Sequence, residues 1–248
     1  MEEYTIRLNK YLANLGICAR RDVKRLLKER VLTVNGERAK EQGVRLDPLK
    51  DDVRLDGKKL KAPELVYYLL NKPNGIISSV ADEFGRKNVT SFIPTTERIY
   101  PVGRLDKDTT GLILLTNDGE LTNHLTHPKY HVYKVYRLKV EGFVNKAQMR
   151  ALQNGVLLDD GITAPATVKI IKESHNQSLL EITLHEGRNR QIRRMCETVG
   201  IKLLELERVA FGPIAIGNLK TGKYRELTMK ELEALKNAVQ IQKSIHTD

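Results

Sequence analysis

The chain has 248 residues, of which 42 are Lys or Arg and 31 are Asp or Glu, so its formal net charge is +11. Its longest apolar runs, such as residues 65–70 and 112–115, fall far short of the roughly 18 residues that a transmembrane helix needs. The basic excess favours a nucleic-acid partner over an acidic small molecule alone.

The charge is distributed unevenly along the chain. Residues 1–61 hold 16 Lys or Arg and 10 Asp or Glu, whereas the other 187 residues hold 26 and 21. Per residue, the first quarter is more than three times as basic as the rest. This asymmetry indicates a separate electrostatic module, with a solvated basic surface as the alternative.

The first residues and the cysteines bear on the cellular compartment. Met1–Tyr4 contains two acids and has neither the basic start nor the apolar block of a secretory signal. Cys18 and Cys196 are too few for a disulfide framework or a four-ligand zinc site. We therefore expect a soluble, cytoplasmic protein with reduced thiols and no membrane partner.

The first predicted elements follow from helical spacing. A helix over 8–15, ended by Gly16, has an apolar face made of Leu8, Tyr11, Leu12 and Leu15. A second helix over 20–29 carries a basic stripe made of Arg21, Lys24, Arg25 and Lys28. Such a row of charges displaces several condensed counterions from a phosphate backbone at once.

Turn signals mark the end of this first module. Residues 31–34 predict a strand that enters a tight turn at Asn35–Gly36. Asp56–Gly57 is a second turn signal, and residues 58–64 predict a linker.

The remainder of the chain mixes strands and helices. Continuous apolar runs at 65–70 and 112–115 are typical of central strands covered on both faces, whereas 134–140 alternates. Further strands are predicted at 166–171, 179–184 and 203–209, and helices at 145–153, 189–199 and 229–239. Thr228 and Glu231 form a capping box at the last helix. Because strands and helices do not alternate strictly, the pattern favours an α+β fold with a mixed sheet.

The basic module resembles a known RNA-binding domain. The stretch Arg7–Gly36 contains Arg-Leu-Asn-Lys-Tyr-Leu-Ala-Asn-Leu-Gly, Ala-Arg-Arg-Asp and Val-Leu-Thr-Val-Asn-Gly, and it is similar to the S4 domain, named after a ribosomal protein. Asn9 and Ala19 depart from the Asp and Ser that the family often has. The resemblance implies structured RNA but no particular reaction. The RNA-binding residues it indicates are Arg7, Lys10, Arg20, Arg21, Lys24 and Arg25.

Several common sites lack their sequence signature. There is no G-x-x-x-x-G-K-[ST], G-x-G-x-x-G or G-x-S-x-G motif, which removes the usual anchors for nucleotide hydrolysis, nicotinamide redox and esterase chemistry. His124, His127 and His131 are close in sequence, but nothing nearby supplies a fourth zinc ligand. We expect them to be surface or internally bonded histidines.

The polar segment 103–111 precedes an apolar strand. Asp106, Asp108 and Thr110 would occupy the first, third and fifth positions of a calcium loop, but the twelfth position is Asn117 and not a bidentate Glu. A calcium site is therefore disfavoured. A polar turn whose carboxylates cap backbone amides is the alternative.

The same segment resembles the catalytic block of a family of RNA-modifying enzymes. Residues 100–120 read Tyr-Pro-Val-Gly-Arg-Leu-Asp-Lys-Asp-Thr-Thr-Gly-Leu-Ile-Leu-Leu-Thr-Asn-Asp-Gly-Glu and are similar to RsuA/RluB-type pseudouridine synthases almost throughout. Asn71–Gly75, Lys134–Tyr136 and Glu186–Arg194 agree with that family in order and spacing. Together with the S4-like module, the resemblance covers nearly the whole chain except its last dozen residues.

The resemblance implies roles for individual residues. Asp106 matches the family's essential aspartate, which assists while uracil leaves its ribose at N1, turns and rejoins through C5. Whether the carboxylate adds to the ribose, adds to the base or removes a sugar proton stays open. An ionised carboxylate in a closed site calls for a nearby cation, and Arg193 matches the family's carboxylate-pairing residue. The family needs no metal and no cofactor.

Further residues follow from the same resemblance. Tyr136 is expected to stack on the target uracil, with its hydroxyl a candidate for proton transfer. Arg104 is expected to hold the surroundings of the flipped nucleotide, and Arg188 and Arg190 are candidate phosphate contacts. Lys72 is expected to shape a strand end beside the site.

Two of these assignments have simpler alternatives. The arginines of the helix over 189–199 also fit its solvated face, because Ile192, Met195, Cys196 and Val199 form an apolar stripe. Tyr136 shares a strand face with Leu138 and Val140 and also fits a core position. Only the family resemblance favours the functional interpretation.

The sequence thus predicts a small S4-like α/β RNA-binding module at 1–62, a larger mixed-sheet pseudouridine synthase domain at 63–240 and a C-terminal tail at 241–248. The expected activity is isomerisation of a uridine in ribosomal RNA, free or in a ribosomal subunit assembly intermediate, by a monomer. The main alternative is a non-catalytic RNA-binding factor of ribosome assembly. A glycosidase using Asp106 and Asp108 is disfavoured, because nothing places the two across a sugar.

Overall fold

The computed structural model describes residues 5–41, 43–48, 50–61, 64–80, 85 and 87–245. The chain divides into two compact units. The first unit holds Met1–Val66, Thr95–Arg98 and Asn117–Gly119, and the second holds Tyr67–Pro94, Ile99–Thr116 and Glu120–Asp248.

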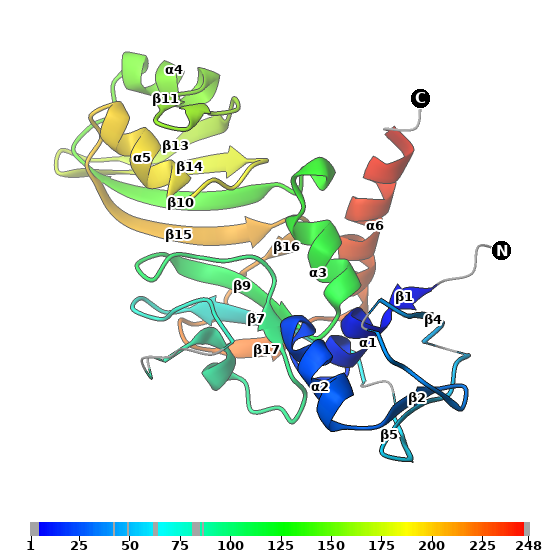
Figure 1. The fold of residues 1–248 in the computed structure, drawn as a ribbon. Coiled ribbons are helices and arrows are strands. Elements are labelled where there is room, and N and C mark those ends of the chain that lie inside the picture. The colour runs from blue at the N-terminus through cyan, green and yellow to red at the C-terminus, as the bar shows by residue number, and fades with distance from the viewer. Residues whose placement is uncertain are drawn as a thin grey trace. The chain divides into compact units, whose positions relative to one another are not determined.

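The first unit contains two short helices and small antiparallel sheets (Figure 1). Its elements are β1 (Ile6–Arg7), α1 (Leu8–Asn14), a 3-10 turn (Arg20–Asp22), α2 (Val23–Glu29), β2 (Leu32–Val34), β3 (Glu37–Arg38), β4 (Arg45–Leu46), β5 (Val53–Leu55) and β6 (Lys58–Lys59). β1 pairs with β4, and the other strands lie in the order β3-β2-β5-β6. Apolar side chains of α1, α2 and the strands, Leu12 and Leu32 among them, form the core of this unit.

The predicted elements of this unit are largely confirmed. Asn35 and Gly36 have φ of 52° and 85°, the left-handed conformation that a two-residue hairpin turn requires. The helix expected over 20–29 begins as a 3-10 turn and becomes α-helical at Val23. The expected linker over 58–64 is wrong at its start, because Lys58–Lys59 pairs with β5. Residues 62 and 63 lie outside the described residues.

The second unit is built around a larger sheet. Its strands are β7 (Tyr67–Lys72), β8 (Tyr100–Pro101), β9 (Thr110–Thr116), β10 (Lys134–Glu141), β11 (Leu157–Leu158), β12 (Gly161–Ile162), β13 (Thr167–Glu173), β14 (Gln177–Leu184), β15 (Leu203–Phe211), β16 (Ile214–Ala215) and β17 (Tyr224–Glu226). Its helices are 3-10 turns at Val89–Phe92 and Pro128–Tyr130, α3 (Gly119–Thr126), α4 (Lys146–Asn154), α5 (Gln191–Thr198) and α6 (Met229–Ile245). α6 continues through residues 241–245 of the expected tail, and residues 246–248 lie outside the described residues.

The main sheet has the order β13-β14-β10-β15-β9-β7-β17, which confirms the expected mixed sheet. Its described pairings are antiparallel except for β15 with β9, which is parallel and joins Glu207 to Thr110 and Arg208 to Gly111. Gly111 has φ of 99°, and a Cβ there would lie 2.3 Å from the Arg208 carbonyl oxygen. The two halves of the sheet can approach this closely only because residue 111 is glycine.

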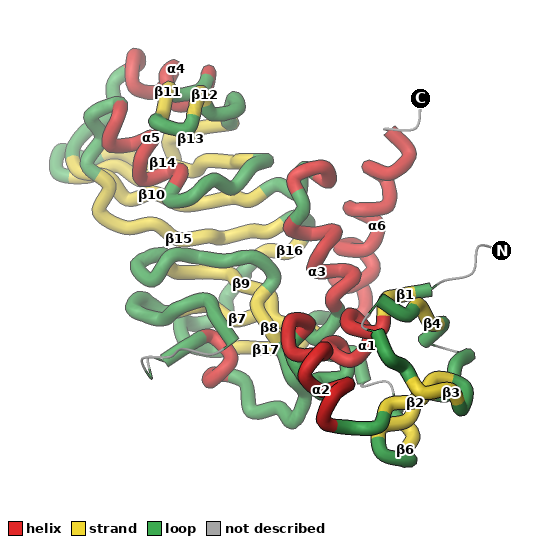
Figure 2. Tube along the Cα trace, viewed as in Figure 1, coloured by secondary structure: helices red, strands yellow, loops and turns green. Residues whose placement is uncertain are grey.

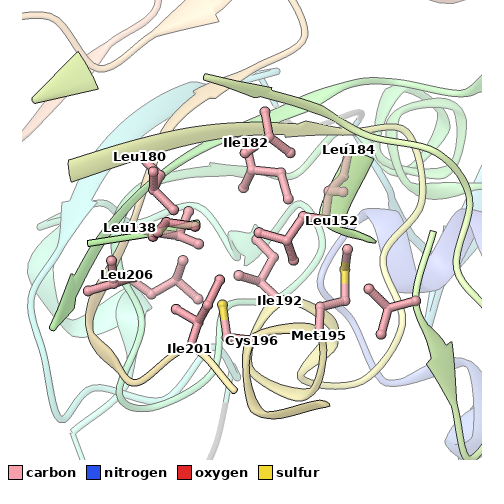
Figure 3. Close-up of a cluster of buried hydrophobic side chains, with 14 of the residues drawn as sticks. Leu138, Leu152, Leu180, Ile182, Leu184, Ile192, Met195, Cys196, Ile201 and Leu206 are labelled. Atoms are coloured by element: carbon pink, nitrogen blue, oxygen red, sulfur yellow. The ribbon is translucent and has the colours of Figure 1, made fainter. Parts of the chain in front are cut away.

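Helices cover the two halves of this sheet separately. α4 and α5 pack on β10, β13, β14 and β15, where Leu152, Met195 and Cys196 meet Leu138 and Leu180 (Figure 3). α3 and α6 pack on the half that contains β7 and β9 (Figure 2). The site described next lies where the β15 half meets the β9 half.

The cysteine prediction agrees with the structure. Cys18 and Cys196 are free thiols, and burial raises the pKa of Cys196 to about 12. That thiol therefore stays protonated and unreactive near neutral pH. Among the described residues, no helix combines the length and the apolar composition that crossing a membrane requires.

Candidate active site

A cleft of about 610 Å³ opens in the second unit and is lined by residues of β10, β15 and the loop that precedes β9. This volume lies in the range of small-molecule and cofactor sites. The predicted catalytic and RNA-binding side chains of this unit all line it, namely Arg104, Asp106, Tyr136, Arg188, Arg190 and Arg193. Segments far apart in the sequence therefore bring the predicted site residues into one cleft.

A buried lysine supports the loop that carries Asp106. Lys72, at the end of β7, is fully buried, and its ammonium donates to the carbonyl oxygens of Pro73 at 3.1 Å, Lys107 at 3.2 Å and Thr109 at 2.7 Å. Burial lowers the pKa of Lys72 to about 8, although the two aspartates of the loop oppose this shift. Lys72 therefore holds the backbone of the loop, whereas the sequence predicts only that it shapes a strand end beside the site.

The segment after Lys72 adds two more fixed points to this loop. The Gly75 amide donates to the Lys107 carbonyl oxygen at 2.9 Å. The Ser78 hydroxyl donates to the Leu105 carbonyl oxygen at 2.8 Å and accepts from the Leu105 amide at 3.1 Å. The loop backbone is thus fixed on both sides of Asp106.

The Asp106 side chain itself is half-buried at the cleft. Within the described residues, its carboxylate has no hydrogen bond and no ion pair, while its backbone carbonyl accepts from the Thr109 amide at 3.1 Å. Both carboxylate oxygens are therefore available to a bound molecule.

The guanidinium of Arg193 pairs with Asp108. Its Nη2 lies 3.3 Å from the Asp108 carboxylate, donates to the Asp108 carbonyl oxygen at 3.0 Å and lies 3.4 Å from the Thr109 hydroxyl. The expected pairing of Arg193 with Asp106 is therefore wrong for this structure, because the neighbouring aspartate takes the guanidinium. At 18% exposure the Arg193 side chain is also no solvated helix face.

Asp108 connects the loop to the start of α5. Arg190 also contacts its carboxylate, at 3.3 Å. Burial acts to raise the pKa of Asp108, but Arg193 and Arg190 outweigh burial and hold that pKa below its usual value. The carboxylate stays ionised near neutral pH, so this contact between loop and helix persists there.

Tyr136 occupies the border between core and cleft. It lies opposite Ile182 on one neighbouring strand and Arg208 on the other. Its half-buried side chain packs against the apolar cluster under α5 and also lines the cleft. The core and site interpretations of Tyr136 are thus both compatible with its position.

Two arginines of the α5 region hold the β11–β12 hairpin. Arg188 donates to Glu186 at 3.2 Å and to the carbonyl oxygens of Gly161 at 3.0 Å and Ile162 at 2.6 Å. Arg194 pairs with the hairpin aspartates, Asp159 and Asp160. These internal partners occupy the guanidinium of Arg188 and disfavour its predicted role as a phosphate contact.

Two family models match this chain. The RNA pseudouridylate synthase model matches residues 66–198, and the S4 domain model matches residues 6–53. The first match spans more than half of the chain and includes Asp106, Tyr136 and Arg193. The chain belongs to the RNA pseudouridylate synthase family.

Relatives within the family match almost the whole chain. Ribosomal large subunit pseudouridine synthase B of Bacillus subtilis is 44% identical over 233 residues, covering 93% of this chain and 95% of that protein. An uncharacterized RNA pseudouridine synthase of Aquifex aeolicus is 41% identical, covering 94% and 95%. The dual-specificity RNA pseudouridine synthase RluF of Escherichia coli is 36% identical, covering 94% and 79%.

A solved structure agrees with these matches. The crystal structure of a pseudouridylate synthase matches with a TM-score of 0.67 at 30% identity, covering 93% of this chain and 99% of that one. The resemblance to RsuA/RluB-type synthases is therefore confirmed, and so is the expected fold.

The S4 domain of this synthase presents the predicted basic side chains to solvent. Arg7, Arg20, Arg21, Lys24 and Arg25 are exposed and Lys10 is half-buried. Arg25 has one long ion pair with Glu29, at 3.9 Å, in which both side chains are more than half exposed. Exposed pairs of this kind contribute little energy, so the stripe is available to an anionic partner.

The predicted histidines do not assemble into a metal site. In the described part of the chain, no group of three or more His, Cys, Asp or Glu side chains is placed to hold a metal ion. His124 and His127 instead pack against the Tyr130 ring, with centroid distances of 4.8 and 6.3 Å. They are structural histidines of the α3 region, as the sequence favours.

Three features of the cleft were not predicted from the sequence. Asp108 was considered only as a calcium or glycosidase candidate, and Lys134 and Arg208, which line the cleft, were assigned no role. Lys134 and Arg208 lie in predicted strands whose alternation of polar and apolar residues is ordinary. The sequence feature that could have identified them is a basic residue at a strand position that faces the core.

Proposed function

We propose that this synthase isomerises a uridine of large-subunit ribosomal RNA to pseudouridine, with Asp106 as its catalytic carboxylate. The observation that carries the proposal is the half-buried Asp106 side chain, whose carboxylate faces a cleft and has no partner among the described residues. The substrate is inferred from the 44% identical relative, which is named a ribosomal large subunit pseudouridine synthase.

The reaction is an isomerisation and needs no co-reactant. The N1–C1′ bond of the uridine breaks, the uracil turns, and a C5–C1′ bond forms. The proton leaves C5, and N1 gains one. Asp106 acts beside C1′ while the base is detached, and the buried ammonium of Lys72 holds the backbone of the loop that carries this carboxylate.

Tyr136 is proposed as the platform for the extruded uracil. Its ring is held by the apolar cluster under α5 and reaches the same cleft as Asp106. Stacking of a base on an aromatic ring contributes about 1–3 kcal/mol. This offsets part of the few kcal/mol that unstacking a base from RNA costs.

Arg193 is proposed as a positioning residue. It contacts Asp108 and Thr109 and so fixes the segment that carries Asp106. A misplacement of about 1 Å in such a segment can cost on the order of 100-fold in rate. The proposed role of Arg193 is therefore to fix the conformation of the loop.

The RNA is proposed to contact the exposed basic side chains. In the second unit these are Arg104 and Arg190, which line the cleft and are exposed. In the S4 domain they are Arg7, Arg20, Arg21, Lys24 and Arg25, together with the half-buried Lys10. We further propose a monomeric, cytoplasmic enzyme that needs no metal, for which full activity in excess chelator is the expected result.

The test is a map of pseudouridines in ribosomal RNA that lacks the modification. RNA is incubated with the protein, and adduct-induced stops of reverse transcription locate each pseudouridine. The wild type is expected to add one stop in the large-subunit RNA. Asp106→Asn is expected to add none while its RNA affinity stays within about threefold of the wild type, because only the charge of one unpartnered carboxylate changes.

Asp108→Asn is the matched control, since it makes the same change two residues away. Its stop is expected at the same nucleotide, at a reduced rate. A stop with Asp106→Asn would exclude this residue as the catalytic carboxylate. Tight RNA binding by the wild type without a stop on any ribosomal RNA or assembly intermediate would favour a non-catalytic RNA-binding factor.

A further inference from the structure

Two basic side chains of the cleft, Lys134 and Arg208, have no role in the function proposed above. We call this pair the basic floor of the cleft. Lys134 and Arg208 project from the neighbouring strands β10 and β15, where Lys134 pairs with Phe211 and Tyr136 pairs with Arg208. Both basic side chains line the cleft and lie over the Phe211 ring, at 5.9 and 5.1 Å from its centroid. The Lys134 ammonium donates to the Val132 carbonyl oxygen at 3.0 Å.

Arg208 is buried although one of its guanidinium nitrogens has no hydrogen-bond acceptor within the described residues. The residue is 2% exposed, and its Nε donates to the Leu112 carbonyl oxygen at 2.8 Å. Its Nη2 is buried and has no hydrogen-bond partner within the described residues. A buried guanidinium nitrogen without an acceptor is costly, because its hydration is lost and nothing replaces it. An acceptor supplied by a ligand accounts for this arrangement.

Within the part of the chain that the structure describes, neither Lys134 nor Arg208 has an ion pair, and their hydrogen bonds go to backbone carbonyl oxygens. Glu186 is the acid that acts on Lys134. Its Oε1 accepts from Gln191 at 2.5 Å and its Oε2 accepts from Arg188 at 3.2 Å, so both oxygens are already engaged. Burial lowers the pKa of Lys134 to about 8, and the neighbouring Arg208 lowers it as well.

We propose that Lys134 and Arg208 bind the oxygens of the detached uracil and stabilise the negative charge that this ring carries between bond cleavage and rejoining. The proposal rests on the function proposed above. When the N1–C1′ bond breaks, its electron pair stays with the ring and spreads over N1, O2 and O4. The ring returns a pair to C1′ through C5. Fixed cations at the oxygens stabilise this state more than the neutral base.

The position of the two cations favours the base over a phosphate. Lys134 and Tyr136 project on the same side of β10, and Arg208 lies opposite Tyr136. A ring stacked on Tyr136 would therefore present its edge to both cations. The RNA backbone stays at the surface, where the exposed Arg104 and Arg190 are available to phosphates.

The experiment compares two small rings of the same outline. Barbiturate is a uracil analogue that is anionic at neutral pH, whereas uracil is neutral. Binding of each to the full-length protein is measured by calorimetric titration from pH 6.5 to 8.5, a range in which uracil stays neutral, with inorganic phosphate as a competitor. The wild type is expected to prefer barbiturate at least tenfold at pH 7, and the preference is expected to fall as Lys134 loses its proton near pH 8.

Three variants make the test specific. Lys134→Met is expected to lose at least tenfold of the preference together with its pH dependence. Lys134→Arg is expected to keep the preference to the highest pH, because arginine does not titrate in this range. Lys139→Met is the matched control, since Lys139 lies on the opposite face of β10 and pairs with Glu205 at 2.9 Å. Lys72 also titrates near pH 8, and it is intact in all three variants.

The groups that face Lys134 are Arg208, Glu186 and Tyr136, and none of them is changed in these variants. Barbiturate binding no tighter than uracil binding, including no measurable binding of either, would overturn the proposal. So would a preference that survives Lys134→Met, or displacement of barbiturate by phosphate at equal concentration. Because the readout is ligand binding, its failure is distinguishable from the absence of pseudouridine formation.

Discussion

The arginines of α2 and those of the cleft differ in how they are held. The Arg25 side chain is 73% exposed and has one ion pair, at 3.9 Å. The Arg193 side chain is 18% exposed, and its guanidinium makes two contacts within 3.3 Å to one residue of the loop. Exposed charges attract a partner through their number and spacing. Buried charges instead fix the positions of the groups that they contact. The same residue type is therefore loosely held in one region and fixed by short contacts in the other.

The largest effect is expected where the charge is most deeply buried. Lys72→Met removes the ammonium that holds three carbonyl oxygens around the loop of Asp106. We expect pseudouridine formation to slow by on the order of 100-fold, because the loop loses its position. Lys87→Met, a change of an exposed lysine in the same unit, is expected to have no effect. Equal rates for the two variants would show that Lys72 does not position the loop.

A charge-conserving pair of substitutions compares the two regions directly. Arg193→Lys keeps the charge but cannot reproduce the contacts to the Asp108 carboxylate and carbonyl oxygen, so we expect a rate loss of roughly 10- to 50-fold. Arg25→Lys keeps the charge on an exposed side chain, and RNA affinity is expected to change less than about twofold. Single-turnover rates and filter-binding affinities measure both. Equal losses for Arg193→Lys and Arg25→Lys would mean that burial does not distinguish the arginines of the cleft from those of α2.

The basic stripe of α2 is expected to act through charge number. Replacing Arg21, Lys24, Arg25 and Lys28 by Gln should weaken RNA binding about tenfold at low salt and reduce the slope of log affinity against log salt by about 1 to 3. The matched control removes four charges from the open face of the larger sheet, at Arg137, Lys139, Lys169 and Lys172. An equal change in slope for both variants would assign binding to net charge and not to the stripe.

The smallest effect on activity is expected at an ion pair far from the chemistry. Arg225 donates two hydrogen bonds of 2.7 Å to Glu231, which also caps α6 through Thr228. These bonds, opposed by burial, lower the pKa of Glu231 to about 2. Glu231→Gln should therefore lower the free energy of unfolding by about 1–3 kcal/mol at pH 7.

The sign of the pH dependence follows from the depressed pKa of Glu231. The stabilisation is complete above the ordinary pKa of 4.5 and is lost as pH falls toward about 2. The difference between Glu231→Gln and the wild type should therefore shrink below pH 4.5 in urea unfolding. Glu233→Gln, a change of an exposed neighbour on α6, should show no such difference. A constant difference at all pH values would contradict the assignment.

Strong local patterns in the sequence predict several elements correctly. The helical spacing of Leu8, Tyr11 and Leu12 and the capping box of Thr228 with Glu231 both appear in the structure. The apolar run predicts a strand at 65–70, whereas β7 spans Tyr67–Lys72. The two ranges differ by two residues at each end because an apolar run does not show where sheet pairing starts. The S4 and synthase resemblances likewise depend on contiguous residues, which a sequence shows directly.

The pairing of charges depends on how distant segments pack against one another. Asp106 and Asp108 are equivalent in a linear pattern, and the packing of α5 on the loop gives Arg193 to Asp108. Lys134 and Arg208 have the pattern of ordinary strand residues, and the pairing of β10 with β15 places them on neighbouring strands and leaves Arg208 buried. Local pattern fixes which residues share a face, but burial and partner choice depend on contacts between segments that are distant in sequence.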